Sequence, residues 1–160
     1  MNTYNPTEEM VLSDGWSVYK KPVVILTESE LMQQAKDKIL QQINEYDESP
    51  EVNICRIRYI NDMFDYWASK SERSALKSAV QDCINMGRDK YRLDLRELGL
   101  SMEVSCKDLI DMLSALEVYA IDCYNKTTDH IYAVNSLTTI EEVERYEYYK
   151  DYPKKLIFDL

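Results

Sequence analysis

The strongest hydrophobic pattern in the chain lies between residues 109 and 134. Its apolar and small residues recur only at spacings of three and four, which places them on one face of an α-helix. They are Leu109, Leu113, Leu116, Ala120, Cys123, Thr127, Ile131 and Val134. Ser105 and Asp108 can cap the start of this helix. We predict an unbroken helix of about 40 Å or more, at 1.5 Å per residue, that packs on a sheet and on a second helix.

A narrower stripe occupies residues 28–48. Thr27 and Glu30 form a capping box before it, and the rest of the segment is Gln, Lys, Asp and Glu. A stripe this narrow suits packing on the domain or a seam between two copies, and the pattern leaves both open. The stripe consists of Met32, Ala35, Ile39, Ile43 and Tyr46. Three of them are interface candidates: Met32, Ile39 and Ile43.

Two segments have the composition of β-hairpins. Residues 52–67 are rich in β-branched and aromatic residues, with Asn61-Asp62 between two such runs. Residues 90–105 alternate apolar and polar positions on both sides of a short Glu-Leu-Gly connection. Between them, Ser69 and Glu72 predict the start of a helix that ends near Gly87.

These elements predict an α+β fold. We expect a small antiparallel sheet of two hairpins packed on the long helix and on shorter helices, with an extended N-terminal arm. The predicted boundaries are an arm over residues 1–27, a linking helix over 28–48, and an α+β domain over 49–160.

The arm contains an apolar run, and no strand is predicted next to it in the sequence that could pair with it. The run Pro22–Leu26 has the character of a strand, which must add to the edge of its own domain or of another protein. We expect the arm to serve attachment. Its interface candidates are Trp16, Val18, Tyr19, Val23, Val24, Ile25 and Leu26.

Four tyrosines crowd the end of the chain just before Pro153. Thr138 or Thr139 can cap a short final helix there. Tyr146 and Tyr152 are expected to seal the fold with their rings, and Tyr148 and Tyr149 would lie on other helix faces as exposed interface candidates.

Composition excludes several classes of function. The net charge of −10 disfavours nucleic acid as a partner, and three glycines argue against a glycine-rich phosphate loop. The first residues resemble no signal peptide, and no run is long enough to span a membrane, so we expect a soluble protein that is not secreted. Four cysteines without a C-x-x-C pair indicate free thiols in a reducing cytosol.

The sequence offers no catalytic constellation. The single histidine, His130, is expected to be a partly exposed spacer beside the long apolar stripe. Cys123 lies about two helical turns away, too far to act with it, and there is no second histidine for a zinc site. The carboxylates fall mostly on polar helix faces. We therefore predict that the protein is not an enzyme and holds no cofactor or metal.

Three segments resemble a protein family encoded by tailed bacteriophages and by prophages of gut bacteria. They read INEYDESPEVN (43–53), MLSALEVYAIDCYNKTTDHIYAVNSL (112–137) and TIEEVERYEYYKDYP (139–153). The resemblance covers about residues 30–156. In the first hairpin relatives favour a glycine in the turn, whereas this chain has NDMFDYWASKSER and keeps Trp67 and Arg73.

The resemblance implies a role in a phage particle. The family's genes commonly lie among tail-fibre and other virion genes, and the family has no assigned enzyme activity. A fibre or surface-appendage component is therefore expected, attached to capsid (a head fibre) or tail and made in the host bacterial cytoplasm. Its partners would be other phage structural proteins and further copies of itself, with a dimer favoured. The alternative is a tail-fibre assembly chaperone that is absent from the finished particle.

Overall fold

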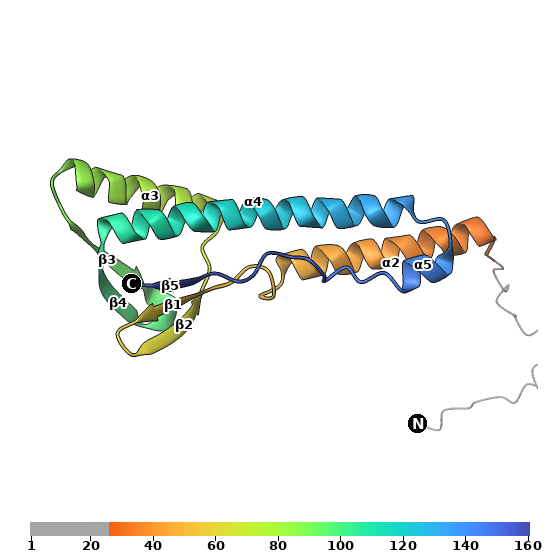
Figure 1. Cartoon of the computed structure of the whole chain (residues 1–160), viewed down its shortest axis with the longest axis horizontal. Coiled ribbons are helices and arrows are strands. Elements are labelled where there is room, and N and C mark those ends of the chain that lie inside the picture. Colours follow the sequence, from red (N-terminus) through yellow and green to blue (C-terminus); the bar gives the residue numbers. More distant parts are fainter. Residues whose placement is uncertain (1–25) are drawn as a thin grey trace, which may run out of the picture.

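One helix, α4 (Cys106–Ser136), runs along most of the length of the molecule (Figure 1). This computed structural model describes residues 26–160. Two small sheets and helix α3 (Lys70–Asn85) lie at one end of α4, and helices α2 (Glu28–Glu48) and α5 (Ile140–Glu144) lie at the other. We call these the sheet end and the helical end. The mixed α+β class and the long helix are confirmed.

The apolar stripe of α4 faces the interior as its spacing predicts. With 31 residues the helix is about 46 Å long. The Ser105 hydroxyl accepts a hydrogen bond from the Asp108 amide and so caps its first turn. Ala120 and Ile131 are half-buried, and the other stripe positions are buried: Leu109, Leu113, Leu116, Cys123, Thr127 and Val134.

The remaining helices begin at capping boxes. Thr27 with Glu30 starts α2, Ser69 with Glu72 starts α3, and a third Thr–Glu pair starts α5. Helix α3 ends in a Schellman motif, in which the Gly87 amide donates to the Ile84 carbonyl at 2.9 Å. Gly87 has φ 77°, a conformation that glycine adopts without strain.

The two predicted hairpins are present, but they belong to two sheets rather than to one. Strands β1 (Cys55–Tyr59) and β2 (Asp62–Tyr66) pair in the first sheet, and β3 (Lys90–Leu95) and β4 (Leu100–Ser105) form the second. The prediction of a single sheet was wrong because the alternating pattern fixes which face of a strand is buried and leaves open which strand edges meet.

A fifth strand completes the first sheet. β5 (Ile157–Asp159) runs parallel to β1, giving the order β2–β1–β5. The Arg56 amide donates to the Leu156 carbonyl, and the Leu160 amide donates to the Arg58 carbonyl, both at 2.9 Å. Three residues are too few for a periodic signal, so the sequence did not predict this strand. Its position brings the C-terminal segment back along the molecule to the sheet end (Figure 1).

The turn of the first hairpin lies one residue earlier than predicted. Tyr59 pairs with Asp62, so the connecting residues are Ile60 and Asn61. Ile60 has φ 59°, a left-handed conformation that costs a β-branched residue about 1–2 kcal/mol. Its side chain is 76% exposed. The turn therefore places an isoleucine where the backbone favours glycine.

Three hydrophobic clusters follow one another along α4. The sheet-end core joins both sheets to α3 and α4, and includes Ile57, Leu93, Leu113 and Leu116. A middle cluster is built on Val52, Tyr119 and Cys123. The helical-end core consists of Ile39, Ile43, Val134 and Val143, contributed by α2, α4 and α5.

Candidate functional site

The predicted interface residues of the arm cannot be placed. Residues 1–25 lie outside the described part of the chain, and with them Trp16, Val18, Tyr19, Val23, Val24 and Ile25. Leu26 is described; it is half-buried just before the start of α2.

The apolar stripe of α2 packs within its own chain. Ile39 and Ile43 are buried against Val134 and Val143, and Met32 packs at the border of the same cluster. The sequence left two roles open for the α2 stripe, packing on the domain and a seam between two copies, and the structure shows packing on the domain. A seam between copies built on these side chains would require them to be exposed.

The tyrosine segment lies against α2 and α4. Helix α5 ends at Glu144, so the tyrosines follow the helix in turns instead of occupying its faces, contrary to the prediction. The ring of Tyr148 is half-buried and makes an edge contact with Tyr46 at 6.0 Å between centroids. Tyr149 is 51% exposed, and its hydroxyl donates to Glu147 at 3.1 Å.

His130 is buried, with 5% of its surface exposed, so the prediction of a partly exposed spacer was wrong. Its Nε2 lies 2.9 Å from the Lys150 carbonyl oxygen and its Nδ1 lies 2.7 Å from the Tyr146 hydroxyl. A carbonyl can only accept, so Nε2 donates; in the tautomer with its proton on Nε2, Nδ1 accepts from the Tyr146 hydroxyl. The ring also stacks on Tyr152 at 5.5 Å. The tyrosines give this histidine its environment, and helix periodicity alone contains no sign of it.

A second polar chain seals the same region. Thr127 Oγ1 donates to Asp47 Oδ1 at 2.6 Å, and the same oxygen lies 2.9 Å from the Tyr152 hydroxyl. Since the threonine proton is used on the carboxylate, the Tyr152 hydroxyl donates to Thr127. All of these groups are satisfied within the chain, which is typical of a network that fixes one packing arrangement.

The described residues hold no activated nucleophile next to His130. Both ring nitrogens are engaged in hydrogen bonds, and the nearest cysteine of α4, Cys123, is buried and its pKa is raised by desolvation. Burial likewise raises the pKa of Cys55 to about 12, so this thiol is protonated at neutral pH. The four cysteines are free. Among residues 26–160 no group of acidic, histidine and cysteine side chains has the arrangement of a metal site.

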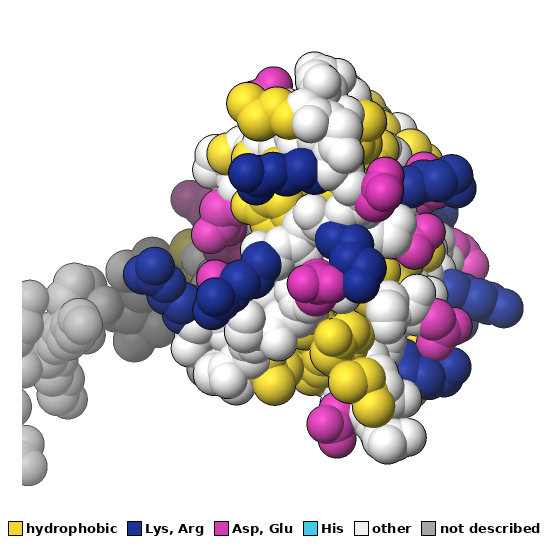
Figure 2. Space-filling view, turned by 90° about the vertical axis from the view of Figure 1, so that its left-hand side faces the viewer, with side chains coloured by type: hydrophobic (Ala, Val, Ile, Leu, Met, Phe, Trp, Pro, Cys, Tyr) yellow, Lys and Arg dark blue, Asp and Glu magenta, His cyan; other side chains and the backbone are white. Residues whose placement is uncertain are grey.

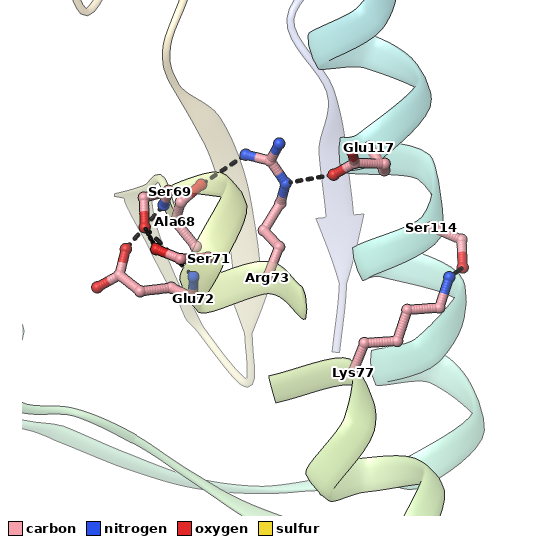
Figure 3. Close-up of polar contacts among 8 residues, drawn as sticks. All are labelled: Ala68, Ser69, Ser71, Glu72, Arg73, Lys77, Ser114 and Glu117. Carbon is pink, nitrogen blue, oxygen red and sulfur yellow. Dashed lines mark hydrogen bonds and ion pairs between the residues drawn. The ribbon is translucent and has the colours of Figure 1, made fainter. Parts of the chain in front are cut away.

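Arg73 lies in a buried junction of three segments (Figure 3). Only 6% of its surface is exposed. Its Nε donates to Glu117 on α4 at 3.0 Å, and its Nη1 donates to the Ala68 carbonyl at 2.6 Å. The guanidinium also lies over the Trp67 ring, 5.3 Å from its centroid. These contacts connect the end of β2, the start of α3 and the middle of α4.

An open groove of about 720 Å³ lies beside this junction at the sheet end. One wall is β3 with the turn after it, a second is one face of α3, and a third is the end of β2. Seen from the sheet end, hydrophobic side chains lie exposed between basic and acidic ones (Figure 2). The lining residues include Trp67, Ala75, Leu76, Tyr91, Leu93 and Leu95.

The solvent side of α4 carries another surface that the sequence analysis missed. Four large apolar side chains there, spaced three, three and eight residues apart, are each more than half exposed. Asn125 and Thr128 lie between them on the same side of the helix, and Glu117, Asp122 and Asp129 border them. A second set of apolar residues outside the first stripe was the signal that could have revealed it. We call it the α4 outer strip: Val118, Ile121, Tyr124 and Tyr132.

Comparison with known proteins gives no assignment. No family model matches the chain, and neither a curated protein nor a solved structure shows significant similarity to it. No helix within residues 26–160 is both long and apolar enough to cross a membrane.

Proposed function

We propose that the protein is a structural component of a tailed bacteriophage particle, a fibre or surface-appendage subunit attached to capsid or tail. The phage context rests on the motifs at 43–53, 112–137 and 139–153. The observation that carries the binding role is the α4 outer strip. Exposed tyrosines with exposed aliphatic neighbours are typical anchors of protein–protein interfaces.

The shape of the molecule supports a role as a spacer. Its two ends are held apart by a helix of about 46 Å, and each end has its own core. The polar groups of the buried junctions bond within the chain, in keeping with a binding protein whose work is done at its surface. The arm, residues 1–27, would provide attachment to neighbouring subunits of the particle.

The test is incorporation into particles. Tyr124→Asp and Tyr132→Asp should leave the protein folded, by circular dichroism, and remove it from purified particles, by mass spectrometry. Gln34→Asp is the matched control, because it adds the same charge at an exposed position of another helix and should be incorporated normally. Incorporation of all three variants at the parent level would refute the binding role of the strip.

The second candidate is a fibre-assembly chaperone, favoured by the same exposed strip because a chaperone also binds fibre subunits. The same preparation separates the two functions. A chaperone would co-purify with fibre subunits from infected cells and be absent from finished particles, whereas a structural component would be present in them.

A further inference from the structure

The groove at the sheet end runs along an unpaired strand edge. Every residue from Tyr91 to Arg96 lines the groove. Because successive side chains of a strand point to opposite faces of the sheet, a groove on one face would be lined by every second residue only. The groove therefore follows the edge of β3. Within the described residues β3 pairs only with β4, so its outer edge has free amide and carbonyl groups. Such an edge is a template for an added strand.

The opposite wall suits an apolar strand. Helix α3 presents Ala75 and Ala79 there, whose small side chains leave room for a backbone, together with Leu76. The half-buried Tyr91 and Leu95 of β3 and Trp67 of the segment after β2 add apolar surface. A strand added here would place alternate side chains against α3, as in recognition by β-augmentation.

The arm of this chain contains a strand of matching character. Pro22–Leu26 is a run of five apolar residues, and Lys20 and Lys21 precede it directly. The charged residues that line the groove are Asp65, Glu72, Asp94, Arg92 and Arg96. The basic pair is complementary in charge to Asp65 and Glu72, which lie on the side of β2 and α3, whereas both arginines lie on β3 and the turn after it.

The run cannot reach the groove of its own chain. It is joined to the start of α2, and α2 has 21 residues and is about 31 Å long. That start is at the helical end, whereas the groove is at the sheet end (Figure 1). Five fully extended residues span at most about 18 Å. Chain connectivity therefore excludes pairing in cis for this run.

We propose that Pro22–Leu26 of one copy adds as a strand to the outer edge of β3 in a second copy, filling the groove between β3 and α3. This inference rests on the proposed role of the arm in attachment, and it names the partner as another copy of the chain. Donor and acceptor lie at opposite ends of the molecule. The contact therefore repeats head to tail, or closes where two copies lie antiparallel.

The first experiment measures the mass of the purified full-length chain by light scattering from one to several hundred micromolar. We expect masses above that of the monomer. Ile25→Asp puts a charge in the added strand and should weaken association at least tenfold, whereas Thr7→Asp, the same charge in the arm but outside the run, should leave it unchanged. A parent chain that is monomeric throughout this range overturns the proposal, as does an Ile25→Asp variant that associates normally.

The groove side has its own matched pair. Ala75→Arg fills the groove and repels the lysines, and Ser78→Arg places the same residue at an exposed position of α3 that does not line it. Only Ala75→Arg should lose association. A mixture of Ile25→Asp and Ala75→Arg should then associate again, because one variant keeps its groove and the other its arm. Absence of complementation between two folded variants overturns the proposal.

A tryptophan reports the contact directly. The chain has two tryptophans, so Trp16→Phe leaves only Trp67, which lines the groove. Its emission maximum should shift to the red on dilution, in step with the light scattering. Emission that stays unchanged on dilution while the scattered light falls overturns the proposal, because the copies then associate without covering the groove. None of these measurements uses phage particles. The strand-addition proposal can therefore be overturned while the protein is still incorporated into particles, and it can be supported while incorporation is absent.

Discussion

The sheet end and the helical end share α4 but are stabilised in different ways. Eleven buried residues form the sheet-end core, whereas four form the helical-end core. The helical end adds two sets of hydrogen bonds that join α2, α4 and the tyrosine segment, Asp47–Thr127–Tyr152 and His130–Tyr146, and the rings of Tyr152 and His130 stack between them. The comparison teaches that one long helix can be covered by apolar packing along one half and by a satisfied polar network along the other.

The largest expected effect tests the sheet-end core. Leu116 is fully buried, and Leu116→Ala should lower the free energy of unfolding by about 2–5 kcal/mol, measured by urea denaturation. Val118→Ala, two residues along the same helix but exposed, should stay within about 0.5 kcal/mol of the parent. If the two variants were equally stable, the apolar core would not be the main support of this end.

The next effect concerns the buried junction around Arg73 at the sheet end. Arg73→Met removes charge-assisted hydrogen bonds to Glu117 and the Ala68 carbonyl, and should cost about 1.5–3 kcal/mol. Lys77→Met is the control, because Lys77 makes one exposed contact with Ser114 (Figure 3), and its effect should be under about 0.5 kcal/mol. A fully stable Arg73→Met variant would show that apolar contact replaces the buried ion pair without loss.

A smaller effect is expected from the polar network of the helical end. Tyr146→Phe leaves Nδ1 of His130 without its donor and should cost about 1–2 kcal/mol. Hydrogen exchange should speed up in residues 146–152 and stay unchanged in the sheets. Tyr132→Phe removes a hydroxyl from an exposed ring and serves as the control. Equal exchange in both variants would mean that the network adds no local stability.

The smallest effect has the opposite sign. Ile60→Gly in the first hairpin relieves a strain of about 1–2 kcal/mol and loses about 0.5–1 kcal/mol to the entropy of glycine, so a net gain of up to about 1.5 kcal/mol is expected. Asn61→Gly, at a neighbour without positive φ, should instead destabilise the protein. Thermal melts of both variants check the sign. A destabilised Ile60→Gly would show that the isoleucine makes a contact worth more than the strain.

Local features of the molecule could be predicted from the sequence alone. The capping boxes at Thr27 and Ser69, the stop at Gly87 and the stripe of α4 depend on residues three or four positions apart, which any helix brings together. The two hairpins follow from alternation within 15 residues or so. The predicted position of the first turn was wrong by one residue, because the glycine-containing sequence that favours such turns is absent.

Only the tertiary structure shows how these elements pack and pair with one another. It closed the α2 stripe against Val134 and Val143, buried His130 beneath the tyrosines and paired β5 with a strand 100 residues earlier. Among residues 26–160 it also left the outer edge of β3 without a paired strand. Each of these depends on contacts between segments distant in sequence, whose free energy comes from burial and hydrogen bonding across the fold, and no short-range pattern encodes them.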